Sequence, residues 1–122
     1  MQKQKILLVE DELTLRETIE EILDLNNYEV ETASNGENAF KILENWQPDI
    51  IISDVMMPVM SGFELIQRIK LIDHLKNIPI IFLSALVAKN EIKKGMNLGA
   101  RAFLTKPFII ADLLKLIKKH IL

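Results

Sequence analysis

Residues 50–54 read Ile50-Ile51-Ile52-Ser53-Asp54, an apolar run that ends on an acid. The run is too short for a helix, and its isoleucines are typical of a strand that is buried on both faces of a parallel sheet. Two other runs have the same form: residues 6–9 lead into Glu10-Asp11, and residues 102–105 lead into Lys106-Pro107. We therefore predict three buried parallel strands, with a charged group at the C-terminal end of each.

The charged residues after these strands should share one edge of the sheet. In open parallel sheets, ligands bind in the crevice outside the carboxyl ends of the strands. We expect one pocket that holds three acids and one amine: Glu10, Asp11, Asp54 and Lys106. Taken alone, the first two acids would suit a solvated loop that opens a helix. Three crowded acids repel one another unless a cation is bound, so the full set favours a metal site.

The rest of the chain alternates short strands with segments of helical period. Residues 28–33 alternate in polarity, which indicates an edge strand, and residues 79–83 predict a fourth strand that stops at Ser84. The first helix has Leu15, Ile19, Ile22 and Leu23 on one face, and the second spans residues 34–43 with Ser34 and Glu37 as a capping box. The third carries Leu65, Ile66 and Ile69 inward, after a loop with Pro58, Ser61 and Gly62. The fourth is weaker because it contains Gly95 and Gly99, and the last spans residues 108–122 with Leu113, Leu116, Ile117 and His120 on one side.

Five strand–helix units follow from this pattern. Right-handed crossovers place helices on both faces of the sheet. We predict an α/β fold: a three-layer, doubly wound, five-stranded parallel sheet of the flavodoxin-like kind, with strand order 2-1-3-4-5.

Length and composition exclude several classes of protein. The 122 residues fit one domain, and the formal net charge of −2 gives no basic field for nucleic acid or an anionic membrane. The absence of cysteine excludes a disulfide frame and a thiolate metal site. No apolar run approaches the roughly 20 residues that span a bilayer. We expect a cytoplasmic domain without direct nucleic-acid or membrane contacts.

Four motifs in this order resemble a known family: Glu10-Asp11, Asp54 with Pro58 and Gly62, Ser84-Ala85, and residues 103–108, which read Phe-Leu-Thr-Lys-Pro-Phe. Together they are similar to the receiver domain of response regulators in two-component signal transduction, the CheY-like fold. The resemblance covers nearly all of residues 1–122 and leaves no output domain in this chain. It implies a phosphoprotein that carries an aspartyl phosphate, and not a dedicated enzyme.

The resemblance also implies the roles of individual residues. Asp54 would be the phosphoacceptor, and Ser84 and Lys106 would contact the phosphoryl oxygens. Mg²⁺ would be bound by Asp11, Asp54 and the backbone carbonyl of Met56, with Glu10 acting largely through water. Ser84 and Phe103 would form the switch, although Phe103 also suits a core position.

The same resemblance implies the partners. A histidine kinase or a histidine phosphotransfer protein would supply the phosphoryl group. The face made by the last two helices and the strand between them would control a downstream target protein or a linked output domain. The sequence does not name the kinase, the pathway or the output, and it fits either a stand-alone regulator or part of a longer protein such as a hybrid histidine kinase.

Two positions depart from common patterns of the family. Met56 and Leu86 are apolar where many relatives carry a polar group that orients the hydrolytic water, so we expect slow autodephosphorylation. Arg101-Ala102 stands where many DNA-binding regulators carry an acidic pair that helps to form a dimer. We expect a monomer or a weak dimer.

Three other functions are compatible with a fold of this kind. A flavin or nucleotide binder would need glycines or hydroxyls in the first loop, which reads Glu10-Asp11-Glu12. A haloacid-dehalogenase-like phosphohydrolase would place a second Asp at the position of Met56. A phosphorylation-independent interaction module with the receiver fold stays open as the alternative.

Overall fold

The computed structural model describes residues 2–85 and 88–122. Five strands form one parallel sheet in the order β2-β1-β3-β4-β5. The strands are β1 (Lys5–Val9), β2 (Glu29–Ala33), β3 (Ile50–Asp54), β4 (Ile80–Ser84) and β5 (Ala102–Thr105). The helices are α1 (Leu13–Leu25), α2 (Gly36–Leu43), α3 (Gly62–Lys70), α4 (Lys89–Asn97) and α5 (Ile110–His120). The predicted three-layer α/β fold and its strand order are confirmed.

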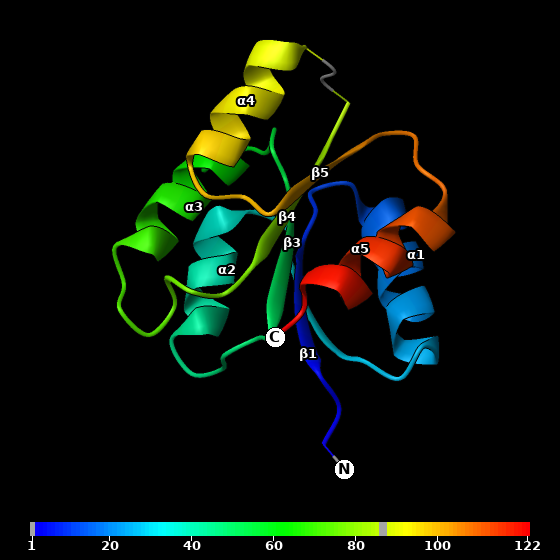
Figure 1. The fold of residues 1–122 in the computed structure, drawn as a ribbon. Coiled ribbons are helices and arrows are strands. Elements are labelled where there is room, and N and C mark those ends of the chain that lie inside the picture. The colour runs from blue at the N-terminus through cyan, green and yellow to red at the C-terminus, as the bar shows by residue number, and fades with distance from the viewer. Residues whose placement is uncertain (1, 86–87) are drawn as a thin grey trace.

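The helices cover both faces of the sheet. Figure 1 shows α1 and α5 on one side of the strands and α2, α3 and α4 on the other. Side chains of the central strands alternate between the two layers: Leu7 and Ile51 pack under α2 and α3, whereas Leu8 and Ile52 pack under α1 and α5. Strands β3 and β4 are buried at every position. This double burial explains why these strands are continuous apolar runs.

The sequence prediction is confirmed for one edge strand and wrong for the other. Strand β2 alternates as expected, with Glu29 and Glu31 exposed. The expectation that residues 102–105 are buried on both faces is wrong, because β5 lies at the other edge of the sheet and is only half-buried, with Thr105 exposed. An edge strand whose side chains are partly covered by helices can be as apolar as a central strand. The apolar run alone therefore does not show which of the two it is.

Two helix boundaries also differ from the sequence prediction. The cap of α2 is Asn35, whose side chain accepts a 2.8 Å hydrogen bond from the Asn38 amide, so the predicted capping box of Ser34 and Glu37 is wrong. Asn35 competes successfully because its side-chain carbonyl is as good a cap as a hydroxyl. Helix α5 is shorter than residues 108–122 at both ends, because the residues that flank it, Ile109 and Ile121, have extended backbones. Within the described ranges, no helix is long and apolar enough to cross a membrane.

Gly62 brings the start of α3 against the end of β3. Its amide donates a 2.8 Å hydrogen bond to the carbonyl of Val55. A Cβ atom at this position would collide with the backbone carbonyl of Asp54 and lie 2.9 Å from the Phe82 ring. The absence of a side chain at Gly62 therefore sets how closely α3 approaches the strand end that carries Asp54.

We expect Gly62→Ala to lower the free energy of unfolding by about 1–3 kcal/mol, because its methyl group meets backbone that cannot move aside. Gly36→Ala is the matched control, since Gly36 also opens a helix but its Cβ would meet the flexible side chain of Met60. Urea denaturation of both variants measures the difference. Equal losses would show that the close approach at Gly62 does not matter.

Candidate functional site

A pocket of about 190 Å³ lies at the C-terminal edge of β1, β3 and β4. It is lined by Glu10, Asp11, Glu12, Asp54, Met56, Leu83, Ser84, Ala85 and Lys106. The residues come from segments far apart in the chain, and the parallel register of the strands brings their ends together. The pocket contains the three acids and the amine that the sequence places at this edge.

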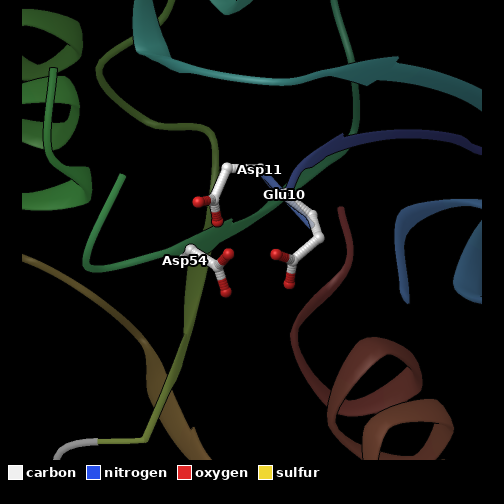
Figure 2. A group of neighbouring side chains, drawn as sticks. All are labelled: Glu10, Asp11 and Asp54. Carbon is white, nitrogen blue, oxygen red and sulfur yellow. The ribbon is translucent and has the colours of Figure 1, made fainter. Parts of the chain in front are cut away.

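The three acids converge on one point. Figure 2 shows the carboxylates of Glu10, Asp11 and Asp54 turned toward one another, and one oxygen of each lies within 4.8 Å of the others. Glu10 is fully buried and Asp54 is 3% exposed, whereas Asp11 is exposed. Clustered carboxylate oxygens, open to solvent on one side, suit a hard cation such as Mg²⁺, which keeps several of its waters.

Lys106 bridges the two buried acids. Its Nζ atom lies 2.8 Å from Glu10 Oε1 and 2.6 Å from Asp54 Oδ1. Burial acts to lower the pKa of Lys106, but the close contacts with Asp54 and Glu10 and their negative charge outweigh it, so the pKa is raised and the amine stays charged. One ammonium group thus faces two buried carboxylates.

Asp54 is the least satisfied of these groups. Neither of its carboxylate oxygens accepts a hydrogen bond from a described residue, and its contact with Lys106 is an ion pair without hydrogen-bond geometry. Burial, and then the closeness and negative charge of Glu10, raise the pKa of Asp54 to about 8 against the opposing effect of Lys106. The pocket therefore has more negative charge than Lys106 alone can balance.

Glu10 is held by its neighbours on every side. Its Oε2 accepts a 3.0 Å hydrogen bond from the Glu12 amide, and its backbone carbonyl accepts a 2.9 Å hydrogen bond from Arg16 Nη1. Burial acts to raise the pKa of Glu10, but the contact with Asp54 and the hydrogen bonds from Lys106 and the Glu12 amide outweigh it, and the pKa is lowered. Sequence reasoning missed Arg16, because an arginine in the first turns of a helix has the pattern of an ordinary surface residue.

The remaining predicted site residues lie in or beside the pocket. Ser84 is buried at the end of β4, and Met56 is 67% exposed at the pocket's rim. Leu86 lies outside the described residues. Phe103 lies in β5, three residues before Lys106, and its ring centroid is 5.6 Å from that of Phe82.

Gly95 of α4 leaves the space that the Phe103 ring occupies. A Cβ atom at position 95 would lie 2.7 Å from the Phe103 ring and 3.2 Å from the Phe63 ring. Phe82 in turn lies 5.3 Å from Phe63 in an edge-to-face arrangement. The aromatic side chain that the sequence singles out is therefore packed inward, between β4 and α4.

Comparisons with known proteins agree with this geometry. The family model of the response regulator receiver domain matches residues 6–118. The chain is 39% identical to the probable transcriptional regulator ycf29 of Porphyra purpurea, over 95% of this chain and 56% of that protein. It is 40% identical to the transcriptional regulatory protein CrdR of Helicobacter pylori, over 98% of this chain and 55% of that protein. The chain thus spans just over half the length of these regulators.

Two solved structures show the same fold over nearly the whole chain. The chemotaxis response regulator CheY4 of Vibrio cholerae has a TM-score of 0.92 at 34% identity and covers 98% of this chain and 100% of its own. The receiver domain of the sensor histidine kinase PA1611 from Pseudomonas aeruginosa, with a magnesium ion coordinated in its active-site cleft, has a TM-score of 0.88 at 28% identity, with 98% of each chain covered. With its strand order, its acidic pocket and a family match from residue 6 to residue 118, this chain belongs to the response regulator receiver domains of two-component systems.

Proposed function

We propose that this receiver domain accepts a phosphoryl group on Asp54 from the phosphohistidine of a histidine kinase or a histidine phosphotransfer protein. The observation that carries the proposal is the convergence of Glu10, Asp11 and Asp54 opposite Lys106. The domain acts in the cytoplasm as a phosphoacceptor that promotes its own phosphorylation and dephosphorylation, and not as a dedicated enzyme. Its output is a change in the face made by α4, β5 and α5, which controls a target protein or a linked output domain.

The donor set of the pocket fits Mg²⁺. Asp11 and Asp54 offer carboxylate oxygens, Met56 offers its backbone carbonyl, and Glu10 acts largely through water. When bound, Mg²⁺ supplies the positive charge that balances the acids and the incoming phosphoryl oxygens. The buried and under-satisfied Asp54 supports this assignment, because a cation removes the reason for its carboxyl group to hold a proton.

The residues of the pocket divide the chemistry between them. An oxygen of Asp54 attacks phosphorus, the bond from phosphorus to the histidine nitrogen breaks, and the imidazole leaves with the electron pair. Lys106, already 2.6 Å from Asp54 Oδ1, is placed to follow the phosphoryl oxygens as a point charge. The hydroxyl of Ser84, which also lines the pocket, can donate to another of these oxygens.

The alternative is a phosphorylation-independent interaction module. Buried carboxylates lower stability unless they are paired, and such a module gains nothing from keeping Glu10 and Asp54 buried with one shared amine.

Curated relatives are named transcriptional regulators. An output that contacts DNA would therefore belong to a linked domain or a partner and not to this acidic pocket.

Intact mass after incubation with acetyl phosphate tests the phosphoacceptor. We expect a phosphoryl adduct that needs Mg²⁺, is lost in Asp54→Asn and persists in the control Asp49→Asn. Asp49 suits this purpose because its carboxylate accepts a hydrogen bond from the Lys5 amide at the opposite edge of the sheet. No adduct in the wild type, even with a panel of histidine kinases, would favour the interaction module.

Thermal unfolding tests the metal site. We expect Mg²⁺ to raise the Tm of the wild type and of Asp49→Asn, because a ligand that binds only the folded state stabilises it. Asp54→Asn should lose this response and, without Mg²⁺, gain about 1–3 kcal/mol of stability, because it removes a buried carboxyl group that lacks hydrogen-bond partners. An unchanged Mg²⁺ response in Asp54→Asn would remove Asp54 from the metal site.

The lifetime of the phosphoryl adduct tests whether the apolar side chain of Met56, at the rim of the pocket, slows hydrolysis. We expect Met56→Asn to shorten the lifetime of the adduct several-fold, because a polar side chain at this position can orient the attacking water. Val59→Asn is the control, since Val59 is equally exposed in the same loop, where its φ of 70° suits asparagine. The decay of the adduct is followed by intact mass after removal of acetyl phosphate. An unaltered lifetime in Met56→Asn would contradict the expectation that the apolar side chain of Met56 makes hydrolysis slow.

A further inference from the structure

Arg16 is a basic residue in the first turn of α1, a helix whose other charged residues are acids. A cation is unfavourable at this position, because the dipole of a helix makes its N-terminus positive. Acids are available one turn away on either side, at Glu12 and Glu20. Among the described residues, no carboxylate forms an ion pair with the Arg16 guanidinium within 4.0 Å. Neither the helix nor an ion pair therefore explains this arginine.

The guanidinium group of Arg16 binds the main chain instead. Its Nη1 atom donates a 2.9 Å hydrogen bond to the carbonyl of Glu10, a residue that is fully buried. The Glu10 amide donates to the carbonyl of Ala33, but no backbone amide of residues 2–85 or 88–122 donates to the Glu10 carbonyl. A buried carbonyl without a donor is costly. Arg16 supplies the missing donor from the first turn of α1.

The same hydrogen bond fixes the peptide unit that joins Glu10 to Asp11. The atoms of a peptide unit lie in one plane, so holding the Glu10 carbonyl also sets the direction of the Asp11 amide and the place of its Cα atom. The Glu12 amide donates to Glu10 Oε2, and the Glu12 carboxylate caps α1 by accepting from the amides of Thr14 and Leu15, at 3.1 and 2.6 Å. The loop is therefore tied to the first turn of α1 before and after Asp11.

Asp11 depends on its backbone more than the other two acids do. Glu10 and Asp54 are buried and contact Lys106. Asp11 is exposed, and the hydrogen bonds and ion pairs of the described residues include none to its carboxylate. Its side chain nevertheless turns toward the other two (Figure 2), with one oxygen of each acid within 4.8 Å of the others. The direction of the Asp11 carboxylate is therefore set by the loop that carries it.

We propose that Arg16 is a positioning residue of the metal site: it holds the peptide unit between Glu10 and Asp11 and so aims the Asp11 carboxylate toward Asp54. The inference rests on the proposed function, because it concerns residues that would bind Mg²⁺. Arg16 does not line the acidic pocket, so it acts through Glu10 and Asp11. Loss of a group that orients a metal ligand lowers metal affinity by roughly 10- to 100-fold.

The charge of Arg16 and its hydrogen bond predict opposite effects on Mg²⁺ binding. A positive charge near the pocket repels a cation, so loss of the charge alone would strengthen the binding of Mg²⁺. Loss of the hydrogen bond frees the peptide unit between Glu10 and Asp11 and weakens the binding. A purely structural role would lower the Tm and leave the dissociation constant for Mg²⁺ unchanged. The sign of the change in this constant therefore distinguishes the three roles.

Titration of Mg²⁺ into Arg16→Met, followed by amide NMR shifts, tests the inference. Methionine keeps an unbranched side chain and a similar helix propensity but removes the charge and the donors. We expect the dissociation constant for Mg²⁺ to rise about tenfold. Phosphorylation by acetyl phosphate should slow at low Mg²⁺ and approach the wild-type rate at saturating Mg²⁺. Arg68→Met is the matched control, because it makes the same change at an exposed arginine of α3, and it should leave both quantities unchanged.

The same variants without Mg²⁺ give a readout that does not depend on the metal. We expect Arg16→Met to shift the amide resonances of residues 10–12 and to speed the solvent exchange of the Glu12 amide, which is bonded to Glu10 Oε2. An unchanged or lower dissociation constant for Mg²⁺, or wild-type resonances at residues 10–12, would overturn the inference. A wild-type protein that binds no Mg²⁺ would overturn the proposed metal site, and the exchange of the Glu12 amide would then decide the role of Arg16 by itself.

Discussion

The burial of two carboxylates at the end of an apolar sheet is the constraint on which this site depends. Glu10 follows β1 and Asp54 is the last residue of β3, and the side chains of these strands fill both layers of the core, so neither acid can turn away into solvent without disturbing its strand. Taking such groups out of water costs several kcal/mol for each ion unless charge and hydrogen bonds offset it. Lys106 offsets part of this cost for both acids, and the remainder makes the pocket a place for a cation and an anion together.

The end of β3 is also held in place by the packing of α3 and of three aromatic side chains. Gly62 contacts the backbone carbonyl of Asp54 and lies close to Phe82, and Phe82 packs against both Phe63 and Phe103. The acceptor strand, the start of α3 and the inner side of β5 therefore share one aromatic side chain. Packing contacts between these residues do not by themselves measure an energetic coupling between Asp54 and Phe103. It does mean that a shift of the Asp54 backbone and a shift of the Phe103 ring are both felt by Phe82.

Much of this structure could be predicted from the sequence, and the exceptions have physical reasons. The grouping of Glu10, Asp11, Asp54 and Lys106 follows from three apolar runs that lead into charged residues, and the other two strands follow from the alternation of residues 28–33 and the apolar run of residues 79–83. The burial of β5 was mispredicted because an apolar run does not reveal whether a strand has one neighbour or two. The contact of Arg16 with the Glu10 carbonyl and the raised pKa of Asp54 depend on distances between segments, which no spacing in the sequence encodes.

Gly95 has a consequence for protein engineering. The space beside it holds the ring of Phe103 and has no room for a methyl group as well. A side chain at position 95 would compete with Phe103 for the same volume and act as a wedge under α4. A single position on α4 thus offers a way to displace the Phe103 ring from its inward packing without changing any residue that lines the acidic pocket.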